Sequence, residues 1–177
     1  MTSLRELIMD KNKITVLPKE LKNLTNLKSL SLNENDISEF PGIVLGSLVS
    51  LKYLYLDYNK LTTIPKDIKS CVNLKTLSCH NNQITTIPVE IGKLTNLIAL
   101  NLSHNNLTVL PAEISQITSL LKLYLNNNKL LSIMTLNCQF TKLNTLTLDN
   151  NKLTMIQPMF NLKSLTKLKR FTLTVTI

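Results

Sequence analysis

Residues that could do chemistry are few in this sequence, and they lie close together. Three of the four tyrosines fall within six residues of the segment Leu51–Pro65, "LKYLYLDYNKLTTIP". The two histidines, His80 and His104, lie one predicted strand apart, and with Asp57 they offer ligands that zinc accepts. No further ligand converges on these three residues, so we predict no metal site. Tyrosine combines a large contact area with a hydroxyl at low entropic cost, which favours a partner-binding surface.

Enzymatic chemistry is not predicted from this sequence. It contains no Ser–His–Asp arrangement, no glycine-rich phosphate loop and no paired acidic site, and it has only three glycines. A reaction centre needs a nucleophile, acid or base held beside groups that orient it, and no such set stands out. We therefore expect no catalytic residues and no cofactor.

The composition favours a globular chain in a reducing compartment. Residues 1–13, "MTSLRELIMDKNK", carry charges along their length and lack the apolar centre of a signal peptide. No apolar run approaches the roughly 20 residues of a membrane span. The three cysteines, Cys71, Cys79 and Cys138, are odd in number and lack metal-type spacing. We therefore expect a cytoplasmic protein.

The tyrosines and histidines belong to a unit that repeats along the whole chain. The unit is 23 residues long, with one unit of 24 residues, and we number its positions from the leucine that opens it. Such a period is typical of solenoid proteins, in which one domain, here residues 1–177, is built from stacked turns. The opening leucines are Leu4, Leu27, Leu51, Leu74, Leu97, Leu120 and Leu143, and a partial last unit starts near Leu168.

Each unit predicts a strand followed by a helical turn. The part "LxxLxLxxN" alternates apolar and polar residues, as a half-buried strand does. The later part "LPxEIxxL" spaces its apolar residues three and four apart, as one turn of helix does. The prolines suit the first helical position, where a missing N–H costs nothing. One unit cannot cover its own leucine face, so neighbouring units must stack.

An asparagine occupies position 9 of every full unit. A buried amide needs partners for its donors and its acceptor. Stacked in a column, these amides can bridge the backbones of adjacent turns, so we predict a structural ladder rather than a catalytic role. Its members are Asn12, Asn35, Asn59, Asn82, Asn105, Asn128 and Asn151.

These units resemble leucine-rich repeats, specifically the intracellular 23-residue "LPxEI" type of Ras-binding scaffolds and fungal adenylyl cyclase. The resemblance implies an α/β repeat solenoid shaped as a horseshoe, with a curved parallel sheet of seven or eight short strands on its concave face. Short helical or 3-10 turns would form the convex face. It also implies a signalling or scaffolding module that binds a partner protein, for example a small GTPase, on the concave face. The alternative is a targeting or regulatory region of a larger signalling enzyme, such as a kinase, phosphatase, cyclase or GTPase.

Two units depart from the repeat pattern. The sixth has Met134 where proline is expected and Asn137 where isoleucine is expected, and the seventh places Pro158 one position late. We expect irregular convex structure there. The chain ends in "RFTLTVTI", a strand pattern with no cap after it, which predicts self-association through this edge. The alternative is that residues of a longer native chain cover the edge.

Positions 3, 5, 7 and 8 of each unit face away from the leucine core and line the open face. All tyrosines and both histidines occupy these positions, whereas the convex half has none. We predict a partner surface here; the alternative is that the tyrosines are solvated and merely pack on their neighbours. The predicted contacts are Tyr53, Tyr55, Asp57, Tyr58, His80, Asn101, His104 and Tyr124.

The net charge of +9 is spread along the chain, with a second cluster of basic residues near its end. It either keeps a leucine-rich solenoid soluble or attracts an acidic protein or, peripherally, a membrane surface. Basic stripes without interleaved stacking aromatics do not indicate nucleic-acid binding.

Overall fold

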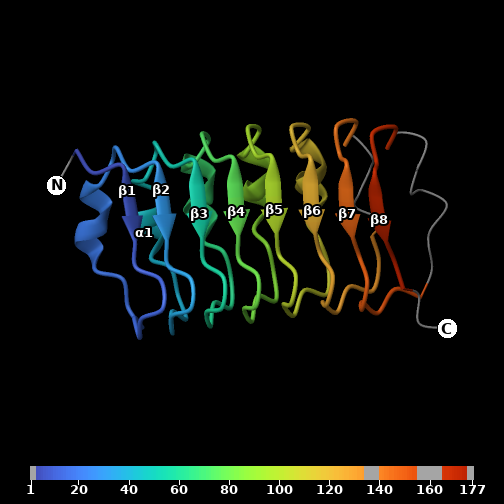
Figure 1. The fold of residues 1–177 in the computed structure, drawn as a ribbon, viewed down its shortest axis with the longest axis horizontal. Coiled ribbons are helices and arrows are strands. Elements are labelled where there is room, and N and C mark those ends of the chain that lie inside the picture. The colour runs from blue at the N-terminus through green and yellow to red at the C-terminus, as the bar shows by residue number, and fades with distance from the viewer. Residues whose placement is uncertain (1–2, 134–139, 155–164, 175–177) are drawn as a thin grey trace.

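The repeats form one solenoid with a single open sheet. The computed structural model describes residues 3–133, 140–154 and 165–174. Its eight strands lie side by side in sequence order, all parallel (Figure 1). They are β1 (Glu6–Ile8), β2 (Ser29–Ser31), β3 (Tyr53–Tyr55), β4 (Thr76–Ser78), β5 (Ala99–Asn101), β6 (Lys122–Tyr124), β7 (Thr145–Thr147) and β8 (Arg170–Thr172).

The strand register stacks equivalent positions of successive units directly on one another. Leu30 pairs with Leu54, which pairs with Leu77, and this continues from β1 to β8. Because side chains alternate along a strand, the central residue of each strand points inward and its two neighbours point outward. The predicted leucine-rich-repeat solenoid is therefore confirmed.

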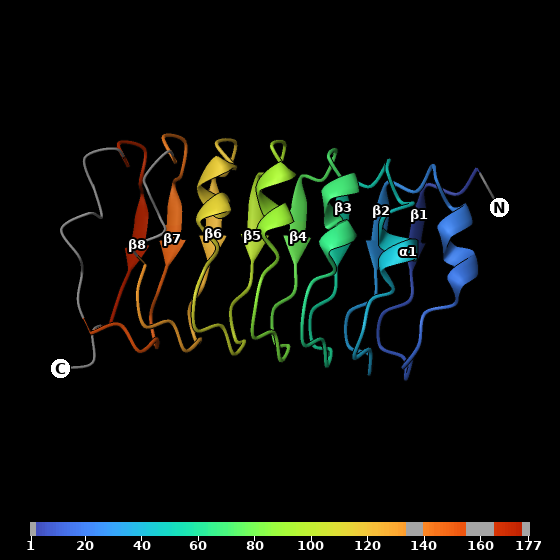
Figure 2. The same cartoon turned by 180° about the vertical axis from the view of Figure 1, so that it is seen from behind.

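Short helices cover the back of the sheet, and they are mostly 3-10 turns (Figure 2). Each 3-10 helix begins one residue later than predicted, because the proline directly precedes the helix and is not its first residue. Pro65 shows why, since its carbonyl accepts the first helical hydrogen bond from the N–H of Ile68 at 3.0 Å. The 3-10 helices are η1 (Lys19–Asn23), η2 (Lys66–Ser70), η3 (Val89–Lys93) and η4 (Ala112–Gln116).

The second unit differs because it has one additional residue. It forms a short α-helix, α1 (Gly42–Leu45), in which the N–H of Gly46 reaches the carbonyl of Gly42 at 2.8 Å. A Cβ at Gly42 would collide with the carboxylate of Asp67 in η2. The glycine thus lets two neighbouring turns approach closely.

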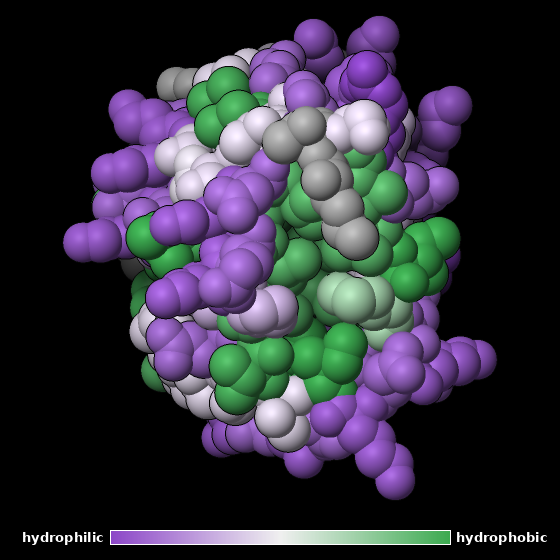
Figure 3. Space-filling model, turned by 90° about the vertical axis from the view of Figure 1, so that its left-hand side faces the viewer, coloured by the Kyte–Doolittle hydropathy of each residue, from purple (hydrophilic) through white to green (hydrophobic). Residues whose placement is uncertain are grey.

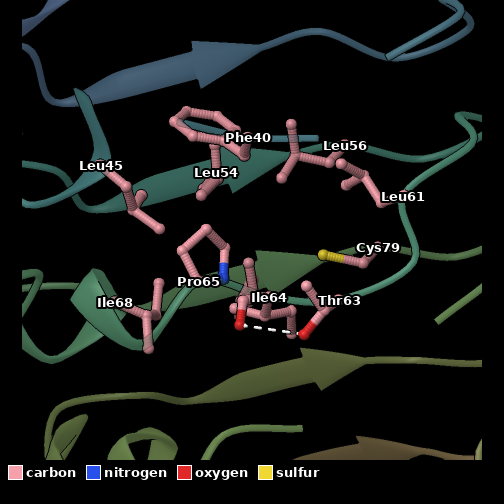
Figure 4. A pocket seen from close by; sticks show the side chains of 11 residues that line it. Phe40, Leu45, Leu54, Leu56, Leu61, Thr63, Ile64, Pro65, Ile68 and Cys79 are labelled. Carbon is pink, nitrogen blue, oxygen red and sulfur yellow. Dashed lines mark hydrogen bonds between the residues drawn. The ribbon is translucent and has the colours of Figure 1, made fainter. Parts of the chain in front are cut away.

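One continuous leucine core runs through the solenoid. It encloses a small apolar cavity beside Cys79, where most other units have leucine (Figure 4). The cavity volume of about 10 Å³ is no more than a single water needs, so it is a packing defect and not a ligand site. Its lining includes Phe40, Leu56, Leu61 and Ile68.

The first turn leaves part of this core open. Leu4, Leu7 and Met9 are only half-buried, whereas Leu27 and Leu30, their counterparts in the next unit, are about 1% exposed. The N-terminal end accordingly shows an apolar area ringed by hydrophilic side chains (Figure 3). Packing of each turn depends on the turn before it, which the described part of the chain does not supply here.

Some predictions concern segments that the structure does not describe. The irregular convex structure around Met134, Asn137 and Pro158 lies outside the described residues, as do Cys138 and the last residues of the chain. Among the described residues, no helix is long and apolar enough to cross a bilayer.

Candidate functional site: the open sheet face

The asparagine ladder lies on the inner side, next to the open face. In a central turn, the Asn105 amide nitrogen donates to the carbonyls of Cys79 at 2.9 Å and Leu102 at 3.1 Å. Its carbonyl oxygen accepts the N–H of Ile84 at 2.9 Å. One side chain thus binds backbone groups of two turns. Equivalent bridges to the preceding turn are made by Asn35, Asn59, Asn82, Asn128 and Asn151.

Asn12 does not bridge two turns, unlike the role predicted for it. It is exposed, and its amide nitrogen donates only to Met9 and Asp10 of its own turn, each at 3.0 Å. The reason is its place in the first unit, where no described turn precedes it. Asn12 therefore closes a local turn and not an interturn contact.

The predicted tyrosines lie on the outer side of the sheet. Tyr53 and Tyr55 project from β3, and Tyr124 projects from β6. In the register, Ser78 and Asn101 stand between Tyr55 and Tyr124, so small side chains separate the two tyrosines. Partial burial, then the neighbouring Tyr53 and Asp57, raise the pKa of Tyr55. Its hydroxyl therefore stays a hydrogen-bond donor at neutral pH.

A row of three rings follows the carboxyl ends of the strands. The rings of Tyr58 and His80 are 5.2 Å apart between centroids, and those of His80 and His104 are 4.8 Å apart. Both pairs meet edge to face at 88°. This geometry is the favourable one for aromatic pairs. The structure thus brings together three residues that lie in three successive units.

Hydrogen bonds to neighbouring side chains hold these imidazole rings in place. The Asn81 amide nitrogen lies 2.9 Å from His80 Nε2, and Ser103 Oγ lies 2.8 Å from His80 Nδ1. An amide nitrogen can only donate, so Nε2 accepts and Nδ1 carries the proton. His104 Nε2 accepts from Asn127 at 3.0 Å in the same way.

His104 also disfavours a positive charge for electrostatic reasons. Partial desolvation, then the nearby His80, lower the pKa of His104. The residues that the structure describes include no group of three or more side chains able to hold a metal ion. The row presents rings that are partly apolar.

Asp57 holds two neighbouring turns together on the outer side of the sheet. Asp57 Oδ1 accepts from Ser78 Oγ at 2.6 Å and from the N–H of His80 at 2.7 Å. Asn101 Oδ1 accepts from Ser103 Oγ at 2.6 Å within its own unit, so this bond does not link two turns. Sequence reasoning placed Asp57 among the partner contacts and missed its bracing role. The available signal was an acid or amide at position 7 followed by serine or threonine at position 5 of the next unit.

Position 8 of the unit has an unusual backbone. Tyr58 and His104 adopt positive φ angles of 55° and 54°, and so do the residues at this position of the other full units, which are Lys11, Glu34, Asn81, Asn127 and Asn150. Asparagine tolerates this left-handed region, whereas bulky side chains rarely adopt it. Two members of the ring row thus occupy a position where asparagine would be less strained. Sequence reasoning did not detect this strain.

Comparisons with known proteins agree with the fold. The family "leucine-rich repeat region" matches residues 43–175, and the family "leucine rich repeat" matches residues 2–67. The chain therefore belongs to the leucine-rich-repeat proteins. Domains of this class generally mediate protein–protein interactions. The curated protein sequences gave no significant match.

Two solved structures are similar over nearly the whole chain. A leucine-rich-repeat protein of Leptospira interrogans is 34% identical, with a TM-score of 0.74, over 98% of this chain and 50% of that one. The ectodomain of the Arabidopsis thaliana membrane receptor kinase GASSHO1/SCHENGEN3 is 31% identical, with a TM-score of 0.81. That likeness covers 96% of this chain and 21% of the ectodomain chain, which was solved in complex with CASPARIAN STRIP INTEGRITY FACTOR 2. This chain thus spans half the length of the bacterial protein and less than a quarter of the length of the plant ectodomain chain.

Proposed function

We propose that this chain is a binding module that holds a partner protein on its open sheet face, between Tyr53 and Tyr124. The observation that carries the proposal is the gathering of large side chains on this one face. Tyr53 is 37% exposed and Tyr58 is 53% exposed, and the rings of Tyr58, His80 and His104 meet in a row. None of these side chains belongs to the leucine core, and aromatic side chains of this kind often carry binding energy in protein interfaces.

The chemistry of this face favours a partner that presents an apolar or aromatic group with polar neighbours. The ring row offers aromatic surfaces, and Tyr58 is 53% exposed. The hydroxyls of Tyr53 and Tyr55 add hydrogen-bond donors beside it. Rigid aromatic side chains of this type supply most of the binding energy in many protein interfaces. The similar plant ectodomain, solved with a bound factor, supports a protein partner.

The finer proposal is a role in cytoplasmic signalling or scaffolding, with a small GTPase or another signalling protein as partner. Support for a reducing compartment comes from Cys71 and Cys79, which are free and buried. A second reading is a targeting or regulatory region of a larger signalling enzyme, and it is favoured by the partial coverage of both similar structures. The length of the natural reading frame separates these two readings.

Substitution on the two faces tests the proposal. A partner is first identified by co-purification, and its affinity for purified variants is then measured by titration calorimetry. We expect Tyr55→Ala to weaken binding by more than about 1 kcal/mol, as an aromatic contact does. Lys66→Ala in η2, on the opposite face, should leave the affinity unchanged. Equal losses in both folded variants would contradict the proposal.

A further inference from the structure

The positive charge is distributed unevenly along the solenoid and is concentrated in its C-terminal third. Residues 1–113 contain 12 Lys and Arg against 10 Asp and Glu. Residues 114–177 contain 8 Lys and Arg against one acid, Asp149. Solubility alone does not require this polarity, because interspersed charges of both signs would provide it. The C-terminal third is therefore a candidate surface for an anion.

A hollow on this third of the molecule collects three of the lysines. It has a volume of about 400 Å³ and is lined by Leu121, Lys142, Asn144, Lys167 and Lys169. This volume lies within the range of ligand-binding pockets, roughly 300–1,000 Å³. In the described part of the chain, the ion pairs are Lys11–Glu34 and Lys60–Asp36, which do not involve these lysines.

The hollow is placed by the repeat itself. Lys142 and Lys167 both stand directly before the opening leucine of their units, and Asn144 and Lys169 both stand directly after it. The backbone N–H of Lys169 donates to the carbonyl of Asn144 at 2.8 Å. The N–H of Asn144 donates in turn to the carbonyl of Leu121 at 2.9 Å. The ammonium groups thus extend from fixed backbone positions in adjacent turns.

The two lysines before the opening leucines break a pattern of the earlier turns. At that position the side chains of Asn73 and Asn96 donate to the carbonyls of Val49 at 3.0 Å and Val72 at 2.9 Å. Ser119 donates to Leu97 at 2.6 Å. Lysine replaces this short interturn bond in two successive units. The substitution gathers positive charge where a hydrogen-bonding residue would stabilise the fold.

An apolar strip continues the hollow toward the middle of the solenoid. Position 2 is Arg or Lys in the first four units, but Ile98 and Leu121 occupy it in the fifth and sixth. Ile98 is 37% exposed, and the N–H of Leu121 bonds to its carbonyl at 2.8 Å, so the two residues adjoin. A ligand seated among the lysines would thus meet apolar side chains on one side.

We propose that this hollow binds an acidic segment of a protein, with carboxylates between Lys142, Lys167 and Lys169. An apolar residue of the same segment would rest on Ile98 and Leu121. Three ammonium groups close together repel one another, and bound carboxylates remove that repulsion. A concave site with an apolar margin suits a peptide better than a membrane, whose flat surface cannot enter it. The hollow adjoins the start of the strands and the ring row follows their ends, so the two sites are separate.

Asparagine substitution tests the hollow without damaging the repeat. The double variant Lys142→Asn with Lys167→Asn restores the residue type of the earlier turns and removes two charges. Lys19→Asn with Lys22→Asn removes two exposed charges from η1 and serves as the matched control. The probe is a fluorescein-labelled peptide of one leucine followed by four glutamates, and binding is followed by anisotropy at low salt.

We expect wild type and the η1 control to bind the acidic peptide alike, and the hollow variant to bind at least about fivefold more weakly. Tyr58→Asn should leave this binding unchanged, which separates the result from the sheet-face proposal. Equal weakening in the η1 control, or no binding by wild type, would overturn the inference. So would a wild type that binds phosphatidylserine vesicles but not the peptide. Circular dichroism confirms that each variant is folded.

Discussion

The asparagine ladder and the open sheet face are built on the same turns but follow opposite rules. Inside, one residue type recurs and makes the same hydrogen bonds, as Asn82 and Asn105 do. Outside, the residue type changes from turn to turn, and the sheet tolerates every change. The difference teaches that the constant positions carry the fold. The variable positions are where a specific function can be placed.

Some residues on the outer side of the sheet have a structural role, however, and are not available to a partner alone. Asp57 braces the neighbouring turn there, whereas Tyr53 and Tyr58 contribute to no ladder and are at least a third exposed. A variable position can therefore still be structural. Hydrogen bonding and strain distinguish the two kinds of residue, and the following predictions test that distinction.

The largest effect is expected from the interior ladder. Asn105→Ala should lower the free energy of unfolding by roughly 1–3 kcal/mol, because buried carbonyls and an N–H of two turns lose their partner. The matched variant Asn12→Ala should cost less than about 0.5 kcal/mol, because Asn12 is exposed and bonds only within its own turn. Urea unfolding followed by circular dichroism measures both. Similar losses at the two sites would contradict the comparison.

A smaller effect is expected where the outer side is structural. Asp57→Ala should cost about 1–2 kcal/mol, because Ser78 and the N–H of His80 both lose a carboxylate acceptor. Asp36→Ala is the control: its ion pair with Lys60 is solvent-exposed and should contribute no more than about 0.5 kcal/mol. The same unfolding assay applies. An Asp57 variant as stable as wild type would show that the bracing is unimportant.

Relief of strain at position 8 should be smaller still and opposite in sign. Glu34 has a φ of 54°, so Glu34→Asn should raise the free energy of unfolding by about 0.5–1 kcal/mol. Tyr58→Asn should gain less, because the ring contact with His80 is lost at the same time. Thermal melting compares the two. A Glu34→Asn variant that is less stable than wild type would show that the backbone at position 8 is not strained.

The smallest effect concerns pH. Because the pKa of His104 is lowered in the folded chain, the unfolded chain binds its proton more readily. The contribution of His104 to the free energy of unfolding is therefore fully present at a pH above 6.5, the ordinary pKa of histidine. It declines as the pH falls below 6.5 and levels off below the pKa of the folded chain. His104→Asn should remove this component and flatten the stability profile below neutral pH. Identical profiles for the two proteins would contradict the assignment.

The fold could be predicted because the pattern leaves little choice. Leucines at fixed positions of a 23-residue unit, with asparagine at position 9, determine which side chains face inward. The face that carries Tyr55 and Tyr124 followed directly from that. The predicted start of each 3-10 helix was wrong by one residue. The proline before the helix has a favourable φ, but it also accepts the first helical hydrogen bond through its carbonyl, and so it precedes the helix.

The hydrogen bonds on the open face could not be predicted, because they join residues of different turns and the pattern of a single unit does not contain them. The bracing by Asp57 requires the register of β3 against β4, and the hydrogen-bonded state of His80 requires Asn81 and Ser103 in place. Asn12 is exposed because no described turn precedes its unit. The strain at Tyr58 is a backbone angle, which residue types alone do not show.

Site-specific photocrosslinking tests the central claim, binding through the open face, most directly. A photoreactive phenylalanine is placed at Tyr53 on the open face or at Lys66 on the opposite face, and each protein is irradiated in cell extract. The account predicts that a crosslinked protein forms from position 53 and not from position 66, and that unlabelled wild type competes it away. Adducts of the same protein that form from position 66 alone, or equally from both positions, would contradict it.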